Sequence, residues 1–181
     1  MPPSAVLLLE DETILRLFPV LRRAWSLKGA QATVGISGAN AKRILFATIN
    51  MRTGHRTAMA YKNMGQKGFQ EFLRLLRRSY RRRQIWMLPD RASAHVAPGS
   101  QALAEALDIV LVWLPKQCSE LNAMDHLWKE VKSDVSANYQ YETIEEHLNY
   151  AMDYLMNLTN KQALTKAGIT LKHFWLKSFF K

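Results

Sequence analysis

The sequence predicts an α/β domain in which a mixed β-sheet carries helices on its faces. Apolar runs of strand length fill the first third of the chain, and helical spacing of apolar residues begins after Gly68. Beyond that point, short apolar runs alternate with helical segments. A chain of 181 residues suits one domain with a full-sized core, so we expect residues 1–181 to form a single domain.

The first third of the chain predicts a meander of antiparallel strands. Its strand-length runs of apolar or β-branched residues are residues 5–9, 33–36, 44–49 and 56–61. Turn-forming residues separate the later runs, at residues 37–40 and 51–55. Short turns of this kind favour antiparallel pairing of the strands that they join.

Two longer helices are predicted by apolar residues at helical spacing. The first would bury Phe69, Phe72, Leu73, Leu76 and Tyr80. The second would bury Leu121, Met124, Trp128, Val131 and Val135. Each set marks one face of a helix, and such a face packs against a sheet.

The remaining elements are shorter or lie near the C-terminus. Buried strands are expected at residues 85–88 and 109–114, and a helix at residues 98–107. A further helix is expected at residues 143–158, where Thr143 and Glu146 have the spacing of a capping box. The aromatic and basic residues 171–181 either pack on the domain or form a tail.

The formal charge of +10 and a pI near 9.9 favour a polyanionic partner, most often nucleic acid. The alternative is a generally basic protein without such a partner. No apolar stretch approaches the roughly 18 residues of a membrane span, and the N-terminus lacks the basic start of a secretion signal. We therefore expect a cytoplasmic protein with no membrane partner. A single cysteine, Cys118, excludes an internal disulfide and a Cys-rich zinc site.

Three aspartates predict a site for divalent cations. Asp11 and Asp90 each follow an apolar run, and Asp125 lies on a helix beside its apolar face. Each aspartate alone would be an ordinary surface residue. Two carboxylates about 4 Å apart repel by roughly 4 kcal/mol at an effective dielectric near 20, so three together require cations or shifted pKa values. Two Mg²⁺ or Mn²⁺ ions suit oxygen ligands and the chemistry of phosphodiester cleavage.

Local motifs resemble those of a known family. They are Glu10-Asp11-Glu12 with the later Trp25, Lys28 and Gly29, residues 89–95, and residues 114–128. Over roughly residues 6–150 the chain resembles the catalytic domain of mariner-type transposases in their bacterial insertion-sequence branch, which belong to the aspartate/glutamate-triad enzymes. The resemblance implies a ribonuclease-H-like fold, a metal-binding catalytic triad of Asp11, Asp90 and Asp125, and supporting roles for His95 and Asn122.

The sequence departs from the family pattern at three points. Asp125 stands where the bacterial branch usually has glutamate, and Arg91 replaces the usual asparagine beside the second acid. We expect the family's N-terminal helix-turn-helix domain, which reads transposon ends, to be absent. We therefore expect a fragment, a split-frame product or a domain that has lost this module, and a separate DNA-reading domain or subunit is a possible partner. The resemblance also implies a homodimer.

Basic side chains are candidates for contact with DNA phosphates. They are Arg74, Arg77, Arg78, Arg81, Arg82, Arg83, Arg91, Lys129 and Lys132. The arginines in residues 74–83 have an alternative interpretation as a solvated helix end that the helix dipole favours. The two lysines have an alternative as ordinary exposed residues.

The predicted function is that of a transposase catalytic domain, which cuts DNA at element ends and joins the ends to target DNA. One alternative is a catalytically weakened or inactive DNA-binding remnant, suggested by Arg91 and Asp125. A further alternative is a ribonuclease-H-type or junction-cutting nuclease, against which the local motifs argue.

Overall fold

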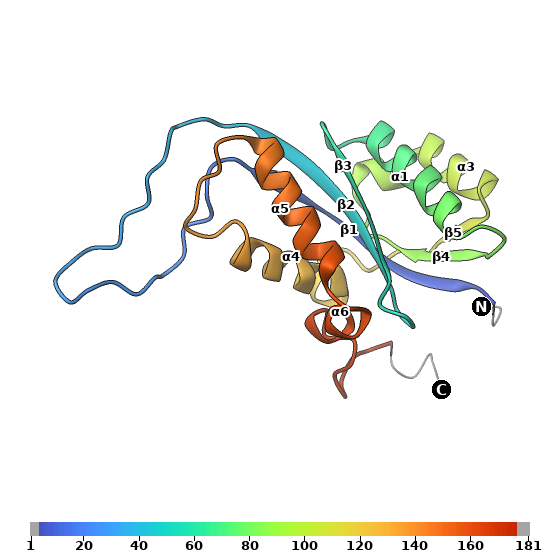
Figure 1. The fold of residues 1–181 in the computed structure, drawn as a ribbon. Helices are drawn as coiled ribbons and strands as arrows, with labels where there is room; N and C mark the ends of the chain where they lie inside the picture. The colour runs from blue at the N-terminus through green and yellow to red at the C-terminus, as the bar shows by residue number, and fades with distance from the viewer. Residues whose placement is uncertain (1–3, 177–181) are drawn as a thin grey trace.

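The computed structural model describes residues 4–176, which form one mixed sheet with helices on both faces (Figure 1). Its strands are β1 (Val6–Arg16), β2 (Lys42–Asn50), β3 (Arg56–Tyr61), β4 (Ile85–Leu88) and β5 (Ile109–Leu111). They lie in the order β3-β2-β1-β4-β5, with β1, β2 and β3 antiparallel and β4 and β5 parallel to β1. The predicted α/β class is confirmed.

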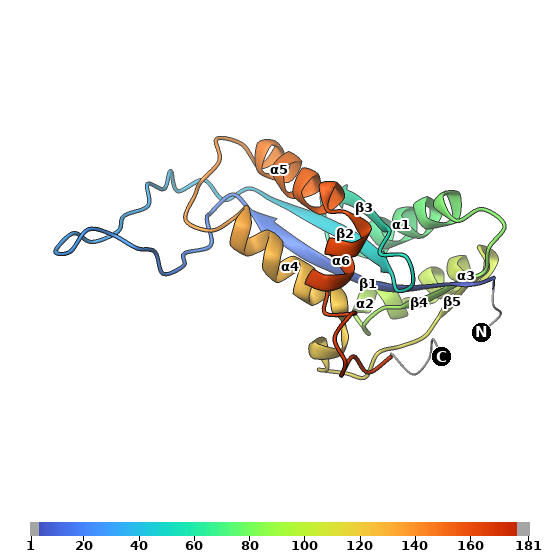
Figure 2. The same cartoon turned by 60° about the horizontal axis from the view of Figure 1, so that its bottom comes forward.

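Two layers of helices cover the sheet (Figures 1 and 2). One layer contains α1 (Gln66–Ser79), α2 (Ser93–Val96) and α3 (Pro98–Ala106). The other contains α4 (Ala123–Asp134), α5 (Ile144–Asn157) and α6 (Asn160–Lys166), and the 3₁₀ turn η1 (Ser119–Leu121) precedes α4. Because side chains alternate along a strand, β1 buries Val6 and Leu8 under the first layer and Leu7 and Leu9 under the second.

The predicted helix faces are the ones that the sheet buries. On α1, Phe69, Phe72, Leu73 and Leu76 are fully buried, and Tyr80 just beyond the helix is nearly so. On α4, Met124, Trp128 and Val131 are buried against the opposite face. Periodicity located both helices correctly because each has one sheet face to cover.

The first strand is longer than predicted, and this corrects the position of Asp11. We expected a strand at residues 5–9 with Asp11 after it, but β1 continues to Arg16 and pairs Asp11 with Ala47 of β2. Glu10, Asp11 and Glu12 interrupt the apolar run without interrupting the backbone hydrogen bonds to β2, which do not depend on side-chain polarity.

The strand predicted at residues 33–36 and the turn at residues 37–40 do not form. Residues 21–41 instead make a long arm that projects from the domain between β1 and β2 (Figure 1). A β-rich run forms a strand only beside a partner, and the arm lies away from the sheet. Lys28 and Gly29 form a turn, closed by a hydrogen bond from the backbone N–H of Ala30 to the Leu27 carbonyl oxygen (2.9 Å).

The remaining differences lie at element ends and in short elements. The strand predicted at residues 109–114 ends at Leu111, and the helix predicted at residues 98–107 ends at Ala106. Half of the predicted capping box forms, because Thr143 accepts from the Glu146 N–H while the Glu146 carboxylate accepts from Glu142 instead. The short helices α2 and α6 were not predicted.

The C-terminal segment packs on the domain as far as the structure describes it. Leu176 is buried, and the Trp175 ring N–H donates to the Leu121 carbonyl oxygen at 2.9 Å. Residues 177–181 lie outside the described residues. No helix within residues 4–176 combines the length and apolar character needed to cross a membrane.

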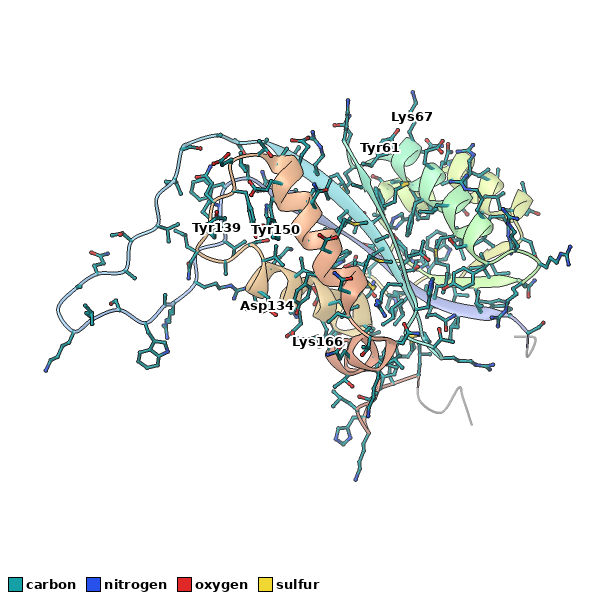
Figure 3. All side chains as sticks on the ribbon, viewed as in Figure 1. Tyr61, Lys67, Asp134, Tyr139, Tyr150 and Lys166 are labelled. Atoms are coloured by element: carbon teal, nitrogen blue, oxygen red, sulfur yellow. The ribbon has the colours of Figure 1, made fainter. Side chains whose placement is uncertain are left out.

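Polar contacts fix α5 and α6 against α4. The Tyr154 hydroxyl donates to Asp134 (2.6 Å), and Lys166 pairs with Glu130; Figure 3 labels Asp134 and Lys166 in this layer. At the root of the arm, the Tyr141 ring lies 4.8 Å and 5.2 Å from the rings of Tyr139 and Tyr150, which Figure 3 also labels. The contacts of Asp134 and Glu130 tie α4, which carries Asp125, to α5 and α6.

Candidate metal and nuclease site

The strand register brings Asp11 and Asp90 to the same level of the sheet. The parallel ladder between β1 and β4 ends at the pair Leu9–Leu88. Asp11 lies two residues beyond Leu9, and Asp90 lies two residues beyond Leu88. Both aspartates therefore lie the same number of residues past the last pair of the ladder. Adjacent strands are about 4.8 Å apart, so the two aspartates begin as close neighbours.

Asn122 joins the third acid to this pair. Its side-chain oxygen accepts from the Met124 N–H at 3.1 Å and thereby caps α4. Its amide nitrogen donates to the backbone carbonyl of Glu10 at 2.7 Å, one residue from Asp11. The same side chain therefore begins α4 and fastens it to β1, which places Asp125 in the first turn beside the sheet edge.

One cavity of about 350 Å³ contains all three predicted acids. Its lining residues are Asp11, Asp90, Arg91, Ala92, Leu114, Pro115, Lys116, Gln117, Cys118, Ser119, Asn122 and Asp125. Three elements distant in sequence thus supply carboxylates to one opening. Cys118, the single cysteine of the chain, lies in its wall.

The electrostatics of Asp11 report its closeness to the other acids. Burial, followed by the charges of Glu12, Asp90 and Asp125, raises the pKa of Asp11 to about 7. A divalent cation among these carboxylates would offset the repulsion that adds to the effect of burial on this pKa. The three aspartates that line the cavity offer carboxylate oxygens, the ligands that Mg²⁺ and Mn²⁺ prefer, so their chemistry fits a divalent cation.

His95 on α2 orients Asp90. Its ring nitrogen Nδ1 lies 2.8 Å from Oδ1 of Asp90, which also accepts from the Ala92 N–H at 2.8 Å. The hydrogen bond from His95 is the main reason why the pKa of Asp90 lies below its usual value. His95 is fully buried and packs against the Phe69 ring, 4.3 Å between centroids. The sequence singled out His95 without assigning it this contact.

Glu10 and Glu12 form a separate buried group with His95. They lie on the face of β1 opposite Asp11, and the Nε2 atom of His95 is 3.7 Å from Glu10 Oε2 and 3.4 Å from Glu12 Oε2. Burial alone would lower the pKa of His95, but the charge of Glu10, the hydrogen bond to Asp90 and the nearby Glu12 carboxylate raise it to about 11. Burial raises the pKa of Glu10 well above its usual value. The period of two along β1 is the sequence signal that separates these acids from Asp11.

The basic residues predicted to contact DNA fall into separate groups. Arg91 lines the cavity, and Lys116, which was not predicted, lines it as well. Lys129 lies 2.8 Å from the Asp125 carboxylate, whereas Lys132 lies in the last turn of α4 beside a different cavity.

The arginine cluster at the end of α1 lies at the other end of the sheet. Arg83 donates to the Ser4 carbonyl oxygen (2.8 Å) before β1, and Arg77 donates to the Leu107 carbonyl oxygen (3.1 Å) before β5. Arg74 pairs with Glu71 at 3.0 Å. The structure therefore does not bring this cluster to the aspartate cavity. Two of its members, Arg77 and Arg83, bind backbone carbonyl oxygens instead. The exposed members of the cluster are Arg78, Arg81, Arg82 and Arg83, and of these Arg83 is bound to the Ser4 carbonyl oxygen.

Comparison with known proteins gives a family for most of the chain. Residues 6–147 match the family model described as DDE superfamily endonuclease. Over 133 residues the chain is 26% identical to a Shigella sonnei protein named insertion element IS630 uncharacterized 39 kDa protein. That match covers 72% of this chain and 39% of the relative, so the chain spans well under half of that protein's length.

Solved structures share the fold. The mariner Mos1 paired-end complex with Mg superposes with a TM-score of 0.75 at 15% identity, covering 94% of this chain and 54% of that chain. The catalytic domain of Mos1 mariner transposase gives a TM-score of 0.61 at 14% identity, covering 90% of this chain and 75% of that chain. At these identities the likeness concerns the fold, and it confirms the ribonuclease-H-like class that the motifs implied.

Proposed function

The chain belongs to the DDE superfamily endonucleases, and we propose that it is the catalytic domain of a DNA transposase that uses divalent cations. The observation that carries this proposal is the single cavity lined by Asp11, Asp90 and Asp125. The IS630 relative and the fold of the Mos1 transposase support the transposase assignment over other nucleases. The activity would be cleavage of phosphodiesters at element ends and transfer of the freed 3′ ends into target DNA.

We assign Asp11, Asp90 and Asp125 as ligands for two Mg²⁺ or Mn²⁺ ions. When bound, such ions supply Lewis acidity to the phosphorus centre and lower the pKa of an attacking water. The residues of the chain fix where this happens. Asp11 and Asp90 come from neighbouring strands, and Asn122 holds Asp125 beside them. His95 and the Ala92 N–H both bind Oδ1 of Asp90 and keep that oxygen in place. Neither group binds Oδ2 of Asp90.

The rim of the cavity would hold the DNA strand. Arg91 and Lys116 supply positive charge beside the carboxylates, where a phosphate would be attracted and oriented. Arg78, Arg81, Arg82 and Lys132 lie farther away, and we propose that they contact flanking phosphates. Binding by such contacts weakens as salt concentration rises.

A partner module completes the proposed function. We propose that a DNA-reading domain or subunit recognises the element ends; the matched region covers 39% of the IS630 relative. We propose a homodimer that acts on DNA in the cytoplasm, in which two catalytic domains each act on one element end.

The test is a cleavage assay on nicked and branched DNA with Mg²⁺ or Mn²⁺, paired with DNA binding by fluorescence anisotropy. Asp90→Ala is expected to lower cleavage by more than about 100-fold, because losing a ligand costs more than losing the outer contacts of a metal site. DNA affinity is expected to stay near that of the parent. Asp153→Ala, on the exposed face of α5, is the matched control and should cleave normally.

Other outcomes point to other functions. Retained DNA binding without metal-dependent cleavage by the parent would favour an inactive remnant. The observation that supports this alternative is the 2.8 Å ion pair of Lys129 with Asp125, one of the proposed metal ligands. Preference for RNA–DNA hybrids would favour a ribonuclease-H-type enzyme. Equal loss of cleavage and binding in Asp90→Ala would contradict the assigned role of Asp90.

A further inference from the structure

The face of β1 opposite the aspartate cavity carries a second convergence of metal-ligating atoms. Glu10 and Glu12 point toward the α1 layer, where His95 of α2 meets both. The three ligand atoms, one from each residue, all lie within 4.8 Å of one another. None of these residues belongs to the triad proposed for phosphodiester cleavage.

These atoms are buried and lack hydrogen-bond partners. The side chains of Glu10 and His95 are 0% exposed, and that of Glu12 is 7% exposed. Within residues 4–176, both oxygens of Glu10, Oε2 of Glu12 and Nε2 of His95 have no hydrogen-bond partner. A buried carboxylate without compensation costs several kcal/mol, so this group needs a proton or a cation to balance its charge.

Carboxylates lie beside both ring nitrogens of His95. Two carboxylates face the Nε2 atom of His95, and a third, that of Asp90, binds its Nδ1 atom. A protonated His95 would supply one positive charge to three carboxylates. A divalent cation between Glu10, Glu12 and a neutral His95 would balance both glutamates directly.

The geometry also fits a cation. Tetrahedral ligands at about 2.1 Å from an ion lie about 3.4 Å from each other, and Nε2 of His95 is 3.4 Å and 3.7 Å from the two glutamate oxygens. The 2.8 Å contact from Nδ1 to Asp90 turns Nε2 toward the glutamates. Carboxylates commonly orient metal-bound imidazoles in this way.

We propose that Glu10 Oε2, Glu12 Oε2 and His95 Nε2 form a buried site for one Zn²⁺ or Mn²⁺ ion, separate from the aspartate cavity. One imidazole with two carboxylates suits these ions better than Mg²⁺, which prefers oxygen ligands alone. The ion would fix the His95 ring and, through it, the carboxylate of Asp90. Its role is to position Asp90, and its presence does not depend on the chain being a transposase.

The test is calorimetric titration of the 181-residue chain with Zn²⁺, and separately with Mn²⁺, after removal of metal by a chelator. Asp11→Asn and Asp125→Asn are introduced first, so that ions cannot use the aspartate cavity. We expect one ion to bind per chain in this background. Adding Glu12→Gln should weaken binding by more than about 100-fold. Adding Glu105→Gln, an exposed glutamate on α3, should leave binding unchanged.

A second measurement covers the case in which the substituted chains fold poorly. Crystals of the unsubstituted chain grown with Zn²⁺ should show an anomalous peak between Glu10, Glu12 and His95. Absence of that peak, absence of binding in the folded background variant, or binding that survives Glu12→Gln would each overturn the proposal. The protonated ring of His95 would then be the only positive charge in the group.

Discussion

The two faces of β1 place neighbouring acidic side chains in different environments. Asp11 faces a cavity that also contains Asp90 and Asp125. Glu10 and Glu12 face the core under α1 and meet the buried ring of His95. One face leaves carboxylates accessible to ions and DNA, and the other encloses them. The alternation of a strand therefore places three consecutive acids in two different environments, and Asp90 connects the two through His95.

The largest effect on stability is expected on the buried face. His95→Ala should lower the free energy of unfolding by about 3–5 kcal/mol, because it leaves buried carboxylates without their positive partner. Urea denaturation in a chelator measures this change. His126→Ala, an exposed histidine on α4, is the matched control and should be close to neutral. A loss as small as that of the control would show that His95 does not hold the buried group together.

An intermediate effect on stability is expected at Asn122, which links α4 to β1. Asn122→Ala removes the cap of α4 and the bond to the Glu10 carbonyl, so it should cost about 1–2 kcal/mol of stability. Cleavage should fall by about 10–100-fold, as for other lost outer contacts of metal sites. Asn122→Ser keeps a cap but does not reach β1, so it should recover most of the stability and little of the cleavage. Full recovery of both would exclude a positioning role for this bond.

The raised pKa of Asp11 should make stability depend on pH. The pKa of Asp11 rises from 3.8 to about 7 on folding, so the folded chain holds a proton that the unfolded chain releases. Without metal, the free energy of unfolding should therefore fall as pH rises from about 4 to about 7, relative to Asp11→Asn. Denaturation of both chains across this window measures the difference. Parallel curves would contradict the raised pKa.

The smallest effect is expected at the rim. Lys129 pairs with Asp125 at 2.8 Å, but its side chain is 64% exposed. Lys129→Gln should change stability by less than about 1 kcal/mol, as is usual for an exposed pair. It should also lower the Mg²⁺ concentration needed for half-maximal cleavage, since the lysine competes for the same carboxylate. An unchanged or higher requirement would show that Lys129 does not compete with metal.

Sequence reasoning succeeded where local patterns determine the structure. Helical spacing identified the buried faces of α1 and α4, and the strand Arg56–Tyr61 was located to the residue. The three acids were chosen by motif, and they line one cavity. Their catalytic role remains a prediction.

Sequence reasoning failed where structure depends on distant partners. Backbone pairing with β2 carries β1 past its acidic residues, and the arm lacks a partner for the strand predicted at residues 33–36. The meeting of His95 with Glu10 requires α2, a four-residue helix without a periodic signal. The arginines after Leu73 were considered as one DNA-binding cluster, whereas folding turns Arg77 and Arg83 onto backbone carbonyls.

The most direct test of the central claim is a crystal structure of the chain grown with Mn²⁺ and measured at the manganese absorption edge. The account predicts anomalous peaks in the cavity within coordination distance of Asp11, Asp90 and Asp125. Peaks found only elsewhere, or a cavity peak that touches just one of these aspartates, would contradict it.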